Sequence, residues 1–79
     1  MTRNGHQIER MAALLRDVQR SGGVDRWSHL HSHGNSFSTV KSAVARGYLN
    51  ETLAYHYKLT DDAAAFFTWH ALWSKVKNE

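Results

Sequence analysis

Residues 36–67, SFSTVKSAVARGYLNETLAYHYKLTDDAAAFF, hold the signals that decide the fold of this chain. Apolar side chains recur at three- and four-residue steps in the first part of the stretch, which predicts a helix over about residues 37–46. Ser36 is suited to cap the start of this helix, and Gly47 is suited to end it in the left-handed conformation. The chain direction is therefore expected to change at Gly47.

A short hairpin and a further helix are predicted after Gly47. Residues 48–50 and the alternating run 55–59 have the pattern of two strands, and a tight turn is expected around residues 51–53. Two consecutive aspartates then favour a helix start, because carboxylates stabilise the N-terminal end of a helix dipole. This last helix is expected to run to about Lys77.

Two helices are predicted upstream of this segment. An apolar stripe at helical spacing predicts the first over about residues 5–20, and a glycine pair is expected to stop it. The second is expected over about residues 26–33, with Asp25 as its N-cap. The sequence therefore predicts one domain over residues 1–79, of the α+β class and mainly α, with three helices, a short β-hairpin and a C-terminal helix.

The composition limits the compartment and the chemistry. The chain has 79 residues, of which 42% are hydrophobic, and it contains no cysteine, which excludes disulfides and thiolate metal sites. No apolar stretch approaches the ~18–20 residues of a membrane span, and the start MTRNGHQIER lacks the apolar core of a signal peptide. We therefore expect a cytoplasmic protein without a membrane partner. The formal net charge of +3 permits an anionic partner but does not require one.

No motif for catalysis or cofactor binding is present in the sequence. Nucleophile–base spacing, a glycine-rich phosphate loop and a paired-carboxylate motif are all missing, so we expect neither an enzyme nor a cofactor. His29 and His33 are four residues apart and could pinch a metal ion on one helix face, with His56 or Asp25 approaching as a third ligand. Histidines at this spacing on a solvated helix are far more common than a metal site, so no metal site is expected.

Residues 24–65 resemble the winged helix-turn-helix domains of small bacterial and archaeal transcriptional regulators of the MarR, PadR and ArsR type. The similarity lies in a short helix (RWSHLHSH), a turn (GNS), a helix that begins with small polar residues and ends in ARGYL, and a strand that passes into a helix through YKLT. In those families the glycine-containing ending closes the recognition helix, and the strand before the threonine ends the wing. The resemblance implies a winged helix-turn-helix fold.

The resemblance also implies that the helix over residues 37–46 enters the major groove of double-stranded DNA while the hairpin flanks the backbone. Small polar and basic side chains on both elements would contact phosphates and base edges. These candidate DNA-binding residues are Ser36, Ser38, Thr39, Lys41, Ser42, Arg46, Asn50, Thr52, His56 and Lys58. Arg3 and Arg10 are candidates for additional phosphate contacts. The expected function is sequence-specific DNA binding by a small dimeric transcriptional regulator.

The last helix carries more apolar residues than one buried stripe needs. Ala64, Phe67 and Ala71 make one face, and a second apolar face lies roughly 100° away by helical geometry. The second face is the expected homodimer interface, since a terminal helix with two apolar faces often turns one toward a partner. Its residues are Phe66, Trp69, Trp73 and Val76. The same helix packs dimers in the resembled families.

The main alternative is a protein-interaction module on the same scaffold, such as a phage- or plasmid-encoded inhibitor or adaptor. It is favoured by the aromatic last helix, by the scant basic charge, and by Glu51 at the expected turn, where a DNA-binding wing would carry an arginine or lysine. One continuous basic face containing Lys41, Arg46 and Lys58 would favour DNA. Scattered charge beside an exposed aromatic patch would favour a protein partner. An RNA-binding winged helix is a third possibility.

Overall fold

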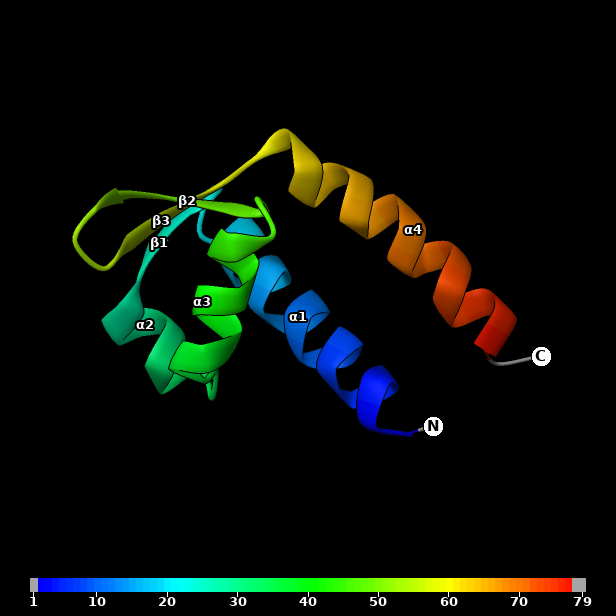
Figure 1. Ribbon diagram of the computed structural model, residues 1–79. Coiled ribbons are helices and arrows are strands. Elements are labelled where there is room, and N and C mark those ends of the chain that lie inside the picture. The colour runs from blue at the N-terminus through cyan, green and yellow to red at the C-terminus, as the bar shows by residue number, and fades with distance from the viewer. Residues whose placement is uncertain (1, 78–79) are drawn as a thin grey trace.

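The computed structural model describes residues 2–77 of the chain, with side chains for residues 6–76. It is a small α+β domain in which most of the described residues are helical (Figure 1). The elements in chain order are α1 (Thr2–Arg20), β1 (Val24–Arg26), α2 (Trp27–Ser32), α3 (Phe37–Ala45), β2 (Leu49–Leu53), β3 (His56–Leu59) and α4 (Asp61–Lys77). The predicted α+β class, mainly α, is confirmed at this level.

The strands form an antiparallel sheet of order β1-β3-β2. Strand β1 was not predicted, and it pairs with β3 so that Val24 lies opposite Lys58 and Arg26 opposite His56. Its three residues are too few to show a period-two pattern. Figure 1 shows α1, α2 and α3 on one side of this sheet, while α4 follows the middle strand, β3, and runs beside α1.

Asp25 does not cap α2 as the sequence predicted. It lies in β1, and the N-cap position belongs to Arg26, which makes no side-chain cap hydrogen bond. The Asp25 carboxylate instead accepts a hydrogen bond from Ser21 Oγ at 2.9 Å and lies 2.7 Å from His29 Nδ1. Asp25 therefore ties the end of α1 to α2 through side chains.

The hairpin turn lies farther along the chain than predicted. Strand β2 continues through Leu53, and Ala54 and Tyr55 form the turn, with a register shift between Glu51 and Leu53. The Tyr55 N–H donates to a Glu51 carboxylate oxygen at 3.0 Å, and the Trp27 N–H donates to the Tyr55 carbonyl at 2.9 Å. The turn contains no glycine or asparagine, the residues that usually mark such a turn in a sequence. Hydrogen bonds from outside the turn hold it instead, so local sequence rules could not place it.

Both predicted ends of α3 are confirmed. Ser36 is the N-cap, and its Oγ accepts from the Thr39 N–H at 3.3 Å. At the other end Gly47 has φ +81°, and the Gly47 and Tyr48 N–H groups donate to the carbonyls of Val44 and Ala43. This Schellman arrangement satisfies the last carbonyls of the helix and turns the chain into β2.

The hydrophobic core lies between α1, α3 and the inner face of the sheet. Its fully buried side chains are Leu14, Leu15, Val18, Leu30, Val40 and Leu49. Tyr57 on the middle strand is also buried against this cluster. The core thus fixes α3 and the hairpin in one body, which sets the relative positions of the candidate site residues.

Candidate nucleic-acid interface

The polar residues at the start of α3 bond mainly to one another. Ser36 Oγ lies 2.8 Å from Thr39 Oγ1 and 3.2 Å from Ser38 Oγ. Ser36 is therefore occupied in capping the helix, which is a structural role, and Ser38 stays exposed beside it. The exposed hydroxyl groups at this end of α3 are candidates for phosphate contacts.

Lys41 in α3 and Arg46, the C-cap residue that follows it, line different cavities. Lys41 faces the hairpin and lines a cavity of about 480 Å³ with Phe37, Glu51 and Tyr55. Arg46 faces the opposite way, and its Nε donates to Ser42 Oγ at 3.3 Å. Lys41 and Arg46 therefore do not lie on one continuous basic face.

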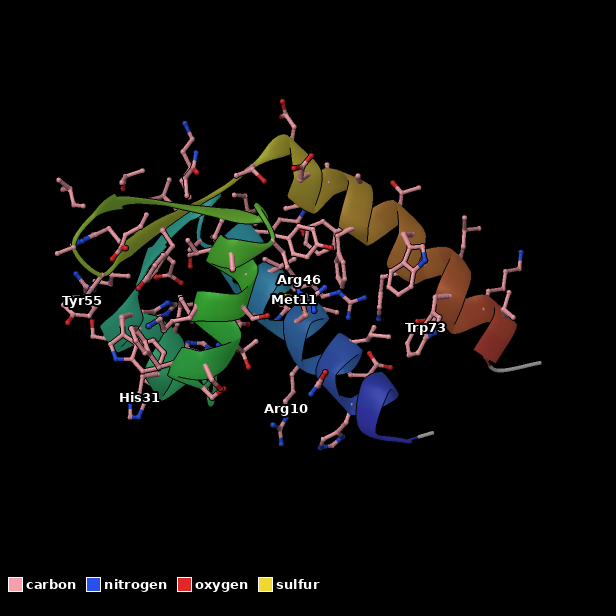
Figure 2. The ribbon with its side chains drawn as sticks, viewed as in Figure 1. Arg10, Met11, His31, Arg46, Tyr55 and Trp73 are labelled. Atoms are coloured by element: carbon pink, nitrogen blue, oxygen red, sulfur yellow. The ribbon has the colours of Figure 1, made fainter. Side chains whose placement is uncertain are left out.

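Arg46 lines a larger groove, of about 950 Å³, between α1, α3 and α4. Figure 2 places Arg46 and Met11 together in the space framed by these three helices. The predicted site residues that share this groove are Arg10, Ser38, Thr39, Ser42 and Arg46. Arg3 has no described side chain, so its predicted phosphate contact lies outside the described residues.

The predicted residues of the hairpin lie on the outer face of the sheet. Asn50 is paired with Lys58, and both are exposed, as are His56 and Thr52. Tyr57, between His56 and Lys58, points to the core, so side chains on either side of it point away from the helices. The candidate DNA-binding residues are thus divided between the α3 side and the outer sheet face.

Sequence analysis missed Arg26 as a member of the outer sheet face. The β1–β3 pairing sets this exposed arginine opposite His56, next to Lys58. The face therefore gathers two permanent cations and one histidine from strands that are about thirty residues apart in the chain. The only sequence signal for this strand is the alternation of Val24, Asp25 and Arg26, which is too short to predict a strand.

Glu51 is not at the tip of the hairpin, where the sequence placed it. Its carboxylate accepts the Tyr55 N–H and so holds the turn from within β2. The tip is formed by Ala54 and Tyr55, neither of which is charged. A carboxylate therefore does not stand at the hairpin tip, where it would repel a phosphate backbone.

The face of α4 assigned to a dimer is divided by the structure. Phe66 is buried in the core of its own chain and stacks on His70, so it cannot lie on an exposed interface. Trp73 is half-buried, whereas Trp69 and Val76 are 45% and 71% exposed. Leu72, which the prediction omitted, is 61% exposed beside them.

The inner face of α4 includes a buried histidine that the sequence did not single out. His70 Nε2 lies 3.1 Å from a Glu9 carboxylate oxygen, and its Nδ1 lies 3.4 Å from Arg16 Nη2. Ala63, Phe66 and His70, with Trp73, form the side of α4 that packs toward α1. The contacts of His70 with Glu9 and Arg16 join α4 to α1 at a defined position along both helices.

Among the residues that the structure describes, no group of three or more His, Cys, Asp or Glu side chains is placed to hold a metal ion. The His29 and His33 rings lie 4.3 Å apart, but His29 Nδ1 is engaged with Asp25. Within the described range, no helix has the length and apolar character needed to cross a bilayer.

Comparison of the chain with protein-family models, with curated proteins and with solved structures gives no match. A functional assignment for this chain therefore depends on the geometry of its own surfaces.

Proposed function

We propose that this chain is a winged-helix DNA-binding protein that regulates transcription. The observation that carries the proposal is that α3 and the β2–β3 hairpin share one hydrophobic core and follow each other along the chain as helix, glycine, strand, turn and strand. Helix α3 keeps its capped, hydroxyl-rich start exposed, and the outer sheet face carries cations. Exposed hydroxyl groups and cations are the groups that commonly contact the phosphates of nucleic acids.

The division of the cations determines how a duplex would bind. On the α3 side, Lys41 lines the hairpin cavity, while Ser38 lines the groove with Arg46. The outer sheet face offers Arg26, His56 and Lys58. Because these surfaces lie on different sides of the sheet, one duplex would use one of them as its main contact. Helix α3 is the better candidate for base recognition, since a helix fits the major groove. The sheet face is suited to phosphate contact.

The proposal is tested by duplex affinity across a salt series for wild type, Lys41→Glu and Lys58→Glu. Each loss of one phosphate contact is expected to weaken binding and to lower the salt slope by about 0.9. Lys75→Glu on α4 is the matched control, because it makes the same charge change at an exposed site remote from both surfaces. Circular dichroism confirms that each variant is folded.

Wild-type protein that shows no salt-dependent binding to any duplex at low ionic strength would exclude the proposal. Equal weakening by all three charge reversals, including Lys75→Glu, would mean that only net charge matters and that neither surface is a site. Weakening by Lys41→Glu alone would assign the duplex to α3, and weakening by Lys58→Glu alone would assign it to the sheet.

A second proposal is that α4 pairs with α4 of a second copy. Ala65, Trp69, Leu72 and Val76 are all exposed and follow the 4-3-4 spacing of a coiled-coil seam; we call these four residues the outer seam. The helix starts with Asp61 and ends near Lys75, so antiparallel pairing sets opposite charges near each other, whereas parallel pairing would oppose like charges.

The exposed outer seam is also the feature that most favours a protein-interaction role. The charges on α3 and the sheet are separated, and the exposed apolar residues of α4 lie together. A different protein with an amphipathic helix would meet the same outer seam. Self-complementary charge makes a second copy the better occupant, and the oligomeric state of seam variants tests it.

A further inference from the structure

Four aromatic side chains from α2, α3 and the hairpin turn form a continuous row at the end of the molecule remote from α4. The ring centres of His31 and Trp27 are 5.2 Å apart, those of Trp27 and Phe37 are 5.1 Å apart, and those of Phe37 and Tyr55 are 6.3 Å apart. We call these four residues the aromatic row. Figure 2 shows its two ends, His31 and Tyr55, on the side opposite Trp73.

The aromatic row is open to solvent along much of its length. Phe37 is 38% exposed and Tyr55 is 57% exposed, His31 is exposed, and only Trp27 is half-buried. The cavity of about 480 Å³ that Lys41 lines opens directly beside Phe37 and Tyr55. Flat ring faces next to an open cavity leave room for a planar group to stack on them.

Tyr55 occupies its position at a conformational cost. Its φ is +63°, and no other described residue apart from glycine has a positive φ. This left-handed region disfavours residues with a side chain, and asparagine or glycine would fit the turn better. The turn hydrogen bonds use only the Tyr55 backbone, so the ring is not needed to close the hairpin. The ring contacts Phe37 but is 57% exposed, and a strained residue with a largely exposed ring indicates a function for the ring.

Cations border the aromatic row. Lys41 Nζ lies over one face of the Phe37 ring, 5.9 Å from its centre, which leaves Tyr55 as the more open ring of the row. Arg26 directly precedes Trp27 and lies opposite His56, at the turn end of the sheet. A carboxylate, Glu51, also lines the cavity and accepts a hydrogen bond from the Tyr55 N–H. Aromatic faces flanked by cations match the chemistry of unpaired nucleotides, whose bases stack while their phosphates attract positive charge.

We propose that the aromatic row binds single-stranded nucleic acid by stacking unpaired bases on Tyr55 and Phe37. Lys41 and Arg26 contact the phosphates on either side. Paired bases within a duplex do not expose their faces, so this site discriminates single strands from duplex. The proposal shares Lys41 and Arg26 with the surfaces proposed for duplex binding, but base stacking on the aromatic row is separate from them. Substitutions of the Tyr55 ring therefore test this proposal without changing the charge of either duplex surface.

The test measures fluorescence anisotropy of labelled oligonucleotides with the full chain at low salt. The probes are single-stranded oligothymidine, single-stranded oligouridine and a mixed-sequence duplex, each about 12 nucleotides long, within the usual range of single-strand sites. Wild type is expected to bind the single strands more tightly than the duplex. The tighter of the two single strands identifies DNA or RNA as the source of the bases.

Tyr55→Asn removes the ring and fits the left-handed backbone, so the variant is expected to melt at or above the wild-type temperature. Its affinity for the single strands is expected to fall between about 5-fold and about 150-fold, the effect of losing one stacked base. Tyr55→Phe keeps the ring face and is expected to retain wild-type affinity. Leu53→Ala, which trims another exposed side chain of the same hairpin, is the matched control and is expected to bind normally.

Three results would overturn the proposal. The first is wild-type protein that does not bind either single strand at low salt. The second is Tyr55→Asn protein that binds single strands as tightly as wild type. The third is an equal loss of duplex and single-strand affinity on Tyr55→Asn, which would indicate a general contact rather than base stacking. Single-strand binding without duplex binding would support this proposal while excluding duplex recognition.

Discussion

Gly47 joins α3 to β2 through a backbone conformation that other residues adopt at a cost. Its φ is +81°, and a Cβ built there would lie 3.3 Å from Asp62 Oδ2. Gly47→Ala is expected to lower the free energy of unfolding by about 1–2 kcal/mol, because the left-handed region penalises a Cβ. Thermal unfolding measures this loss, because each kcal/mol lowers the melting temperature of a domain of this size by about 4–8 °C.

Gly34→Ala is the matched control for this prediction. Gly34 has φ +87° and also ends a helix, but a Cβ there would have no neighbour within 4 Å. Any extra loss at Gly47 therefore measures the contact with Asp62, which is expected to be small because an exposed carboxylate moves easily. An unchanged melting temperature for Gly47→Ala would show that the backbone relaxes and that the left-handed cap is not needed.

Asp25 makes the stability of the domain depend on pH. Burial would raise the pKa of its carboxyl, but hydrogen bonds from His29, the Arg26 backbone and Ser21 outweigh burial and hold the pKa below its ordinary value of 3.8. A lowered carboxyl pKa stabilises the fold above the ordinary value, and this stabilisation is lost as the pH falls through the folded-state pKa. Neutral pH is therefore where Asp25 contributes most.

Asp25→Asn is expected to cost about 1–2 kcal/mol at neutral pH, since hydrogen bonds to a charged carboxylate are lost. The difference from wild type should shrink as the pH falls below 3.8. Urea unfolding at several pH values provides the measurement. In a His29→Ala background the same change should cost less. A difference between wild type and Asp25→Asn that stays constant down to low pH would contradict the role of the charge.

At the scale of the element, α4 carries two apolar seams with different environments. The inner seam, Ala63, Phe66, His70 and Trp73, packs toward α1, and the outer seam is exposed. Phe66→Ala is expected to cost about 3–4 kcal/mol, because it leaves a cavity in the core. Leu72→Ala is expected to change the stability of the monomer by less than about 0.5 kcal/mol. Urea unfolding at low protein concentration compares them, and similar losses would mean that both seams are buried.

The two seams show what sequence reasoning could and could not resolve in α4. The sequence predicted two apolar faces roughly 100° apart, and the structure has two such faces. Their membership was wrong, because Phe66 and Trp73 turn toward α1 while Leu72 belongs to the exposed side. A helix that is apolar nearly all round carries no polar face to set its rotation. Its neighbour α1 sets that rotation.

At the scale of the whole molecule, the outer seam predicts self-association. The domain measures 41 × 22 × 21 Å, and Figure 1 shows α4 running along α1 toward the end where both termini lie. Sedimentation velocity over a range of concentrations is expected to show a dimer that dissociates on dilution. Leu72→Glu should give a monomer, because it buries a charge at the centre of the seam.

Ala71→Glu is the control for that experiment, since residue 71 is exposed and lies about 100° around the helix from Leu72. It should leave the dimer intact. Wild-type protein that remains a monomer at high micromolar concentration would exclude the second copy as the occupant of the outer seam. Dissociation by both substitutions would show that net charge, rather than the seam, controls association.

Sequence patterns were sufficient to predict the elements whose signals are local. The Ser36 cap, the Gly47 helix end, the start of α4 at Asp61 and the α+β class all depend on neighbouring residues, and the structure confirms them. Such features follow from capping, backbone conformation and periodicity within a few residues.

Features that depend on contacts between distant residues could be seen only in the folded domain. Strand β1 exists because β3 supplies its hydrogen bonds, and Arg26 joins Lys58 on one face through that pairing. The hairpin turn is held by a carboxylate of its own strand and by the backbone of α2. The candidate cations lie on separate surfaces because alternate strand residues point to opposite faces of the sheet, and only the packed core defines which face is outside.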